Sequence, residues 1–299
     1  MKFGLQVPSF TWPGGTPEIG PTLGRVVTTA EAAGFDSLWV MDHFFQIRGV
    51  GPKEDPMLEG MTALGWIAAR TTKPALGLMV GGIHYRNPAL WIKSTTTLDV
   101  LSGGRAWFGI GAAWNEEESR GLGFPFPALG VRFEMLEETL QMAHRMWTGE
   151  RGTEGEFEGR HYRAERLLNS PQSIQRPRIP IMIGGGGEQK TLRLVAQYGD
   201  ACNVGWGNPE SIAHKVDVLR GHCEAIGRPI EEIEITTLLT VDIATRGGSG
   251  RHSPAQIVDW FGSLADVGVE HVLFSLPNVD DTARLERLGA DVLPQARGL

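Results

Sequence analysis

Eight short apolar runs, each followed by a helix or by a segment long enough for one, most constrain how this chain can fold. Within each run the apolar residues are largely continuous and do not alternate with polar ones. Continuous apolarity is typical of strands buried on both faces, as in a parallel sheet. The runs cover residues 3–7, 37–41, 75–80, 106–110, 179–183, 201–204, 233–241 and 271–276.

Helix signals fall between these runs. Residues 16–33 read as a helix that stops at Gly34, since glycine readily adopts the left-handed conformation after a last turn. A capping side chain followed by proline marks a helix start. This pair occurs at Asp55-Pro56, Asn87-Pro88, Asn208-Pro209 and Ser253-Pro254. In residues 132–147, apolar side chains recur every three or four positions, which predicts a helix with one face in the core.

Eight strand-then-helix repeats predict a (β/α)8 TIM barrel, which takes about 250 residues. The chain has 299, and we expect one domain over 1–299. The excess forms two insertions, one after the fourth strand (116–130) and one before the fifth (151–178), the second with a hairpin at 155–162. The rival fold is a doubly wound open sheet. It would need a glycine-rich turn after the first strand, and Val7-Pro8-Ser9-Phe10 is not one.

Charge, apolar runs and cysteine number exclude several classes of function. A net charge of −7 argues against non-specific binding to nucleic acid. No run reaches the roughly 18 apolar residues of a membrane span, and residues 1–10 do not resemble a signal peptide. Cys202 and Cys223 are too few for a CxxC pair or a four-ligand zinc site. We expect a cytoplasmic protein that binds neither nucleic acid nor membranes.

Active sites of such barrels lie at the carboxyl ends of the strands, so residues that end each run are the candidates. His43, after the second strand, can exchange a proton near neutral pH, or simply bond to a loop. After the third strand, Gly81 and Gly82 form either a tight turn or a surface that a flat ligand approaches closely. His84 is interpreted as a loop residue.

Two further strand ends suggest a ligand site. After the fourth strand, Gly111 and the alanines behind it would leave room in the barrel mouth, with Trp114 and Asn115 on its rim. After the fifth strand, Gly184, Gly185, Gly186 and Gly187 enter a helix that contains Thr191. Their amides can bind a phosphate there, although a flexible turn is the alternative. Gln189 stands where a P-loop needs glycine, so that motif fails.

The sequence gives little indication of a metal site or of a side chain that acts as a covalent nucleophile. Asp42 and His43 are adjacent, so on an extended strand end they point to opposite sides. No HExxH spacing occurs, and Ser9, Ser37 and Ser275 lack a nucleophile elbow. The strand ends therefore favour a cofactor site with a phosphate cradle, a glycine-lined slot and one proton-transfer histidine. We predict no metal.

Six segments together carry a family resemblance. They are GFDSLWVMDHF (34–44), YRNPAL (85–90), LDVLSGGR (98–105), FGIG with Trp114-Asn115 (108–115), FEGRHY (157–162) and PIMIGGGG (180–187). In this order, over roughly residues 1–275, the chain resembles the bacterial-luciferase-like oxidoreductases, and among them the branch that uses the deazaflavin coenzyme F420.

The resemblance implies a TIM barrel that holds F420 or FMN at its carboxyl mouth. His43 matches the acid/base, and the glycine run with Thr191 matches the phosphate site. A cis peptide that bulges against the ring is expected near Met79–Val80. The expected cofactor-binding residues are Asp42, Met79, Val80, Gly81, Gly111, Trp114, Asn115, Gly184, Gly185, Gly186, Gly187 and Thr191. A homodimer is also expected.

Two departures narrow the choice within the family. Trp114 stands near the catalytic glutamate of sugar-phosphate dehydrogenases, which argues against that substrate. Ala112 stands near an arginine that helps the FMN luciferases bind flavin phosphate, and its absence favours F420. We therefore expect an F420-dependent oxidoreductase that transfers a hydride between the deazaflavin C5 and a small organic substrate, with His43 as acid/base.

Three other functions stay open from sequence. One is an FMN-dependent monooxygenase, which would take reduced flavin from a partner reductase and consume oxygen. Another is a non-catalytic flavin or deazaflavin carrier, in which replacing His43 would change nothing. A metal-dependent hydrolase is the weakest, and a chelator would test it.

Overall fold

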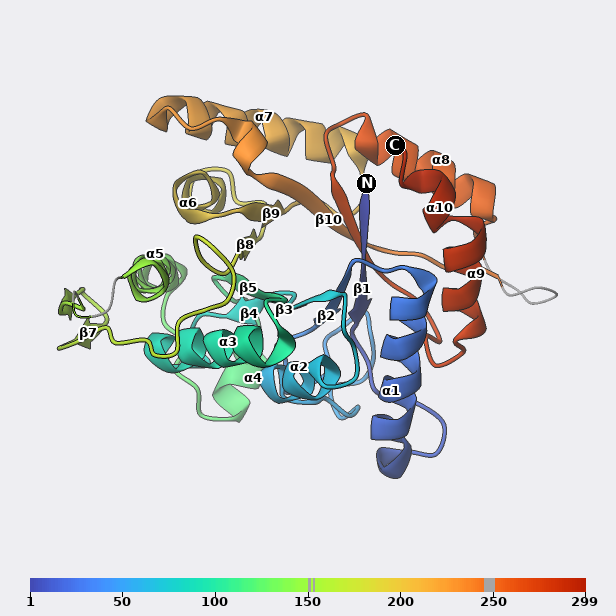
Figure 1. Cartoon of the computed structure of the whole chain (residues 1–299), viewed down its shortest axis with the longest axis horizontal. Coiled ribbons are helices and arrows are strands. Elements are labelled where there is room, and N and C mark those ends of the chain that lie inside the picture. The colour runs from blue at the N-terminus through green and yellow to red at the C-terminus, as the bar shows by residue number, and fades with distance from the viewer. Residues whose placement is uncertain (150–151, 153, 245–250) are drawn as a thin grey trace.

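The computed structural model describes residues 1–149, 152, 154–244 and 251–299. Eight parallel strand positions close into a barrel with helices outside it, as predicted (Figure 1). The ring runs β3-β2-β1-β11-β10-β9-β8-β5, and pairing of β3 with β5 closes it. The strands are β1 (Lys2–Val7), β2 (Ser37–Val40), β3 (Ala75–Leu78), β5 (Ala106–Gly111), β8 (Ile181–Gly184), β9 (Ala201–Asn203), β10 (Glu234–Thr240) and β11 (His271–Ser275). The short β4 (Gly81–Gly82) follows β3 and pairs with β5.

Helices cover the outside of the barrel, and the two chain ends lie near each other (Figure 1). The larger helices are α1 (Thr16–Ala33), α2 (Gly60–Ala68), α3 (Pro88–Ser102), α5 (Leu129–Thr148), α6 (Thr191–Tyr198), α7 (Pro209–Ile226), α8 (Pro254–Ala265) and α9 (Ala283–Asp291). Shorter helices are α4 (Glu116–Gly121), the 3-10 helix η1 (Ile230–Glu232) and α10 (Leu293–Ala296). Within the described ranges, no helix combines the length and apolarity that crossing a bilayer requires.

Three of the four predicted cap-plus-proline starts are confirmed, because Asn87, Asn208 and Ser253 each cap a helix. The start at Asp55-Pro56 is wrong. α2 begins at Gly60, and Glu59 is its cap, accepting from the Thr62 amide at 2.7 Å. Glu59 also pairs with Arg86. Tertiary contacts thus favour a later helix start than the local signal indicates.

Both insertions lie where they were expected. The first contains α4 and leads to α5, which spans the helix predicted over 132–147. The second contains an antiparallel hairpin of β6 (Phe157–Glu158) and β7 (Arg163–Ala164), slightly later than predicted. Residues 151 and 153 of this insertion lie outside the described residues.

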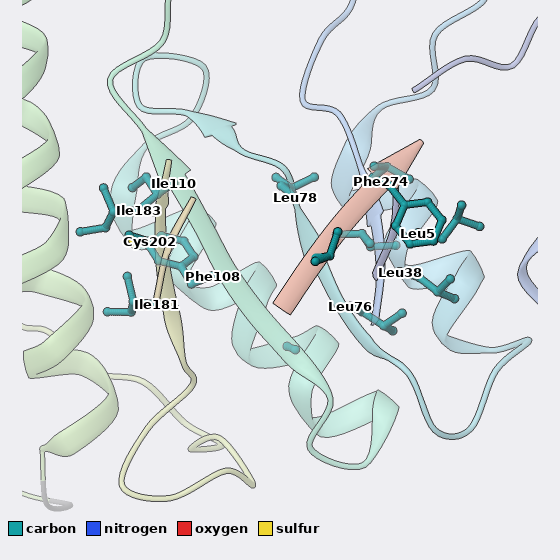
Figure 2. Packing of buried hydrophobic residues seen from close by; sticks show 14 of the residues in the cluster. Leu5, Leu38, Leu76, Leu78, Phe108, Ile110, Ile181, Ile183, Cys202 and Phe274 are labelled. Carbon is teal, nitrogen blue, oxygen red and sulfur yellow. The ribbon is translucent and has the colours of Figure 1, made fainter. Parts of the chain in front are cut away.

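Strand side chains alternate between two buried layers. One set, including Leu5, Phe108 and Ile181, packs in the main cluster with helix side chains (Figure 2). The other set, including Trp39, Met182 and Leu273, fills a second cluster inside the barrel. Burial of each large side chain stabilises the fold by about 1.5–3 kcal/mol. Because both strand faces are buried, the strands read as continuous apolar runs.

A chain of polar contacts closes the amino end of the barrel, where the strands begin. His271 contacts Ser37 Oγ through Nε2 at 2.9 Å and Glu234 Oε1 through Nδ1 at 2.7 Å. Trp39 Nε1 donates to the same serine at 2.7 Å, and Lys2 Nζ donates to Glu234 at 2.6 Å. These contacts join β1, β2, β10 and β11.

Candidate functional site

Asp42, two residues after the end of β2, holds the segment around β4 in place. Its carboxylate accepts the Gly82 amide at 2.9 Å and a two-pronged pair of hydrogen bonds from Arg86, each 2.7 Å long. The side chain is buried. Both oxygens are therefore used inside the protein, and the structure gives Asp42 a scaffolding role at this strand end.

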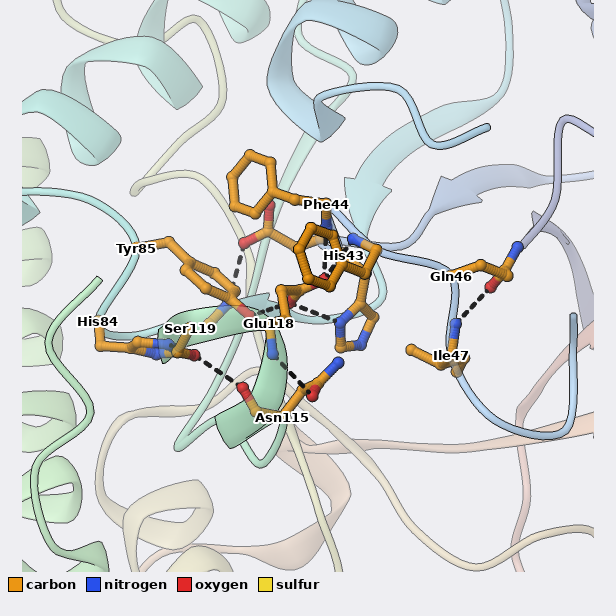
Figure 3. A network of polar contacts seen from close by, with 12 residues as sticks. His43, Phe44, Gln46, Ile47, His84, Tyr85, Asn115, Glu118 and Ser119 are labelled. Carbon is orange, nitrogen blue, oxygen red and sulfur yellow. Dashed lines mark hydrogen bonds and ion pairs between the residues drawn. The ribbon is translucent and has the colours of Figure 1, made fainter. Parts of the chain in front are cut away.

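His43 contacts Glu118 of α4, whereas Asp42 contacts Gly82 and Arg86. Its Nδ1 lies 3.1 Å from Glu118 Oε1 (Figure 3). Tyr85 donates its hydroxyl to that same oxygen. The other oxygen accepts the backbone amides of Phe44 at 2.6 Å and Phe45 at 2.7 Å. Glu118 thus ties together segments that follow β2, β4 and β5.

The Glu118 carboxylate is fully buried. Burial raises the pKa of Glu118, but hydrogen bonds from His43, Tyr85 and the Phe45 amide outweigh it and hold that pKa below its ordinary value. Burial, together with the bond to Glu118, also raises the pKa of the Tyr85 phenol well above its ordinary range. At neutral pH the site therefore holds an ionised carboxylate beside a neutral phenol.

The other ring nitrogen of His43 is open. Nε2 bonds to no described residue, and it is not one of the buried atoms that lack a partner, so it reaches the surface. The exposed indole of Trp114 packs edge-on against the His43 imidazole, with ring centroids 5.4 Å apart. This nitrogen is therefore accessible and free to accept or donate a hydrogen bond.

His84 belongs to the same network but differs from His43. Its Nε2 lies 2.7 Å from Ser119 Oγ, and that hydroxyl donates to the Asn115 carbonyl. Burial, assisted by the positive charge of Arg132, lowers the pKa of His84 to about 4. His84 is therefore neutral at physiological pH. Asn115 itself caps α4 by accepting from the Glu118 amide at 3.3 Å.

Packing explains why residues 81 and 82 are glycines. A Cβ on Gly81 would lie 2.1 Å from the Trp91 ring, and one on Gly82 would lie 2.6 Å from the Tyr85 ring. The space beside both glycines is thus taken by the protein's own aromatic side chains.

The peptide bond between Met79 and Val80 is cis, at the position expected from the resemblance. Val80 follows it and packs beside the ends of β5 and β8. A Cβ on Gly111 would lie 2.9 Å from Val80 Cγ2, and one on Gly184 would lie 2.7 Å from it. Val80, not empty space, therefore fills the room that these two glycines leave in the mouth.

The loop from β8 to α6 has the form of an anion cradle. Within the described residues, the amides of Gly186 and Gly187 donate to no protein group, and the Thr191 hydroxyl makes no hydrogen bond to one. A Cβ on Gly187 would lie 2.9 Å from Thr191 Oγ1, so only glycine leaves that hydroxyl uncrowded. Lys215 lies beside the loop, paired with Glu188.

Aromatic side chains line the segments around His43. Phe44 stacks on Phe124, with ring centroids 5.2 Å apart, and Tyr85 contacts both rings edge-on. Trp206, which follows β9, is 80% exposed. In the part of the chain that the structure describes, no group of acidic, histidine or cysteine side chains could hold a metal ion.

The structure thus gathers His43, Trp114 and Asn115 around one mouth, with Val80, Gly111 and Gly184 in contact beside it. Glu118 was not among the predicted site residues. The sequence shows three consecutive glutamates at a helix start, a pattern that normally indicates an exposed first turn. Only the third is buried, and no local signal distinguishes it from Glu116 and Glu117.

Comparisons with known proteins agree with this architecture. A protein of Kineococcus radiotolerans named F420-dependent glucose-6-phosphate dehydrogenase is 26% identical over 92% of this chain and 93% of its own length. One of the same name from Nakamurella multipartita is 29% identical, over 95% of this chain and 79% of its own.

Solved structures share the fold. The coenzyme F420 dependent tetrahydromethanopterin reductase of Methanopyrus kandleri has a TM-score of 0.80 and 18% identity, covering 98% of each chain. An F420-dependent secondary alcohol dehydrogenase has a TM-score of 0.81 and 16% identity, covering 99% of each. The model of the luciferase-like monooxygenase family matches residues 1–268. The chain therefore belongs to the luciferase-like monooxygenase family.

Proposed function

We propose that this protein is an F420-dependent oxidoreductase that acts on a small organic substrate, with His43 as acid/base. The observation that carries the proposal is the open Nε2 of His43 at the carboxyl end of the barrel, with Nδ1 held by a buried carboxylate. The relatives and structural neighbours named as F420-dependent enzymes support the choice of cofactor.

The residues present fit a phosphate-bearing cofactor. The Gly186 and Gly187 amides and the Thr191 hydroxyl, all without protein partners in the described chain, offer donors at the start of α6. We assign the phosphate to Gly184, Gly185, Gly186, Gly187 and Thr191. We assign the ring to the wall formed by Met79, Val80, Gly81 and Gly111, with Trp114 and Asn115 on its rim.

When bound, F420 would supply the hydride chemistry. The chain supplies orientation and a proton. His43 Nε2 would accept a proton from a substrate that is oxidised and return it to one that is reduced. Asp42 would act indirectly, since its bonds to Gly82 and Arg86 hold the wall rather than a ligand.

We also propose a single cytoplasmic domain that forms a homodimer. A groove of about 300 Å³ between α2 and α3 is lined by uncharged residues, including Met61, Gly65 and Leu101. Leu101 is 79% exposed there. Leu101→Glu should convert dimer to monomer in light scattering, whereas a monomeric wild-type protein would refute the assembly.

Two separate calorimetric titrations of the purified protein, one with F420 and one with FMN, test the proposal. Tight binding of F420 with weak binding of FMN is the expected result. The opposite preference would favour a flavin monooxygenase, and oxygen uptake would then be measured. Binding of neither would mean that the glycine loop is only a turn, and the proposed function would fail.

A further inference from the structure

The two oxygens of the Glu118 carboxylate have different neighbours. Oε2 accepts two backbone amides, those of Phe44 and Phe45. Oε1 meets two side chains, His43 Nδ1 and the Tyr85 hydroxyl (Figure 3). An ionised carboxylate can only accept hydrogen bonds. Every polar atom that faces Oε1 must therefore present a hydrogen to it.

We propose that Glu118 is a positioning residue that sets the tautomer of His43, with the proton on Nδ1 and the lone pair on Nε2. The inference rests on the proposed acid/base role of His43. In this tautomer Nε2 is ready to accept the proton that a substrate hydroxyl releases as its carbon gives up a hydride to the cofactor and becomes a carbonyl carbon. The nearby carboxylate then stabilises the imidazolium that results.

The substitution Glu118→Gln reverses this arrangement without removing the side chain. The amides of Phe44 and Phe45 are fixed donors, so the glutamine oxygen must take the place of Oε2. Its NH2 group then takes the place of Oε1 and donates toward His43. His43 Nδ1 must become the acceptor, and its proton moves to Nε2. A nearly isosteric change thus replaces the lone pair at the mouth by an N–H.

Nuclear magnetic resonance of the cofactor-free protein measures this directly. The protein is labelled with ¹⁵N-histidine, and the His43 signals are those that disappear in His43→Ala. We expect a protonated Nδ1 and an unprotonated Nε2 in neutral wild-type His43, and the reverse in Glu118→Gln. A protonated Nε2 in neutral wild-type His43, or an unchanged tautomer in the variant, would overturn the proposal. The wild-type result decides even if the variant does not fold.

Two matched controls separate tautomer control from a merely structural role. Tyr85→Phe removes the other donor to Oε1 and should leave the His43 tautomer unchanged. Glu117→Gln removes a charge from the adjacent, exposed glutamate, which pairs with Lys53, and should change neither tautomer nor turnover. If Glu117→Gln altered the His43 signals as Glu118→Gln does, general charge loss would explain the effect and the proposal would be wrong.

Turnover with F420 completes the test. Glu118→Gln should lower turnover by about 10²–10⁴-fold, the range that a positioned general acid–base group contributes. In a His43→Ala background it should cause little further loss, because there is no ring left to orient. Near-wild-type turnover of Glu118→Gln would refute the positioning role. Near-wild-type turnover of His43→Ala would refute the proposed function, while the tautomer measured in the cofactor-free protein would be unaffected.

Discussion

The two ends of the barrel each hold a histidine whose Nδ1 contacts a glutamate, and they differ in what the second ring nitrogen meets. At the amino end, His271 is held by Glu234 and Ser37, so both nitrogens are satisfied inside the protein. At the carboxyl end, His43 is held by Glu118 alone, and Nε2 is open. A histidine–glutamate pair is therefore no sign of chemistry by itself. What matters is whether the far nitrogen is free for a ligand.

The largest expected effect is loss of turnover in His43→Ala. General acid–base catalysis contributes about 10²–10⁴-fold, so we expect at least a ~10²-fold decrease with cofactor affinity retained. Steady-state kinetics and calorimetry would measure both. His161→Ala, which breaks another histidine–glutamate pair far along the chain, is the matched control and should leave turnover intact.

The next effect is on folding stability, at the other end of the barrel. His271→Ala would remove one of the two partners of the buried Ser37 hydroxyl and one of the two side-chain partners of Glu234, which costs up to about 3 kcal/mol of unfolding free energy. Urea denaturation would measure the loss. Turnover per folded molecule should stay within about twofold of wild type. A large drop in turnover with unchanged stability would contradict the prediction, because it would give His271 the role that we assign to His43.

His84 provides a third case, a histidine at the mouth that contacts no carboxylate. Its pKa of about 4 in the folded protein lies below the ordinary value, so the unfolded chain binds more protons between pH 6.5 and 4. Stability should therefore fall as pH falls through this window, by about 2 kcal/mol from this group. Urea denaturation at pH 7.0, about 5.5 and about 4.5 should show a shallower fall in His84→Gln. Parallel curves would contradict the prediction.

The smallest effect expected is that of Ser37→Ala. It leaves Trp39 Nε1 and His271 Nε2 without their hydroxyl partner, at a cost of about 1 kcal/mol. Ser211→Ala, on the exposed side of α7, should cost nearly nothing. Equal stability of the two variants would show that the contacts at the amino end do not support the barrel.

The barrel could be predicted from sequence because its signals are local. Each strand is a short apolar run, and three of the four helix starts predicted from a capping side chain followed by proline are confirmed. The exception, Asp55-Pro56, failed where Glu59 serves both as the cap of α2 and as the partner of Arg86. A contact between residues so far apart in the chain cannot be predicted from the sequence around either one.

The site could be predicted only in part, for the same reason. His43 is recognisable because it follows a strand. Glu118 becomes its partner through a contact across 75 residues, and nothing around it signals burial. The glycines at 81 and 82 were recognisable as special, yet the side chains that demand them, Trp91 and Tyr85, emerge only from the fold.

The packing of Val80 against Gly111 and Gly184 has a consequence for how this mouth can evolve. A methyl group added at residue 111 or 184 would meet a Val80 side chain already within 3 Å. Alanine at either glycine would therefore be tolerated only after Val80 becomes smaller. Such non-additivity is typical of residues that share one volume. The order of substitutions therefore matters here, with residue 80 changing before residue 111 or 184.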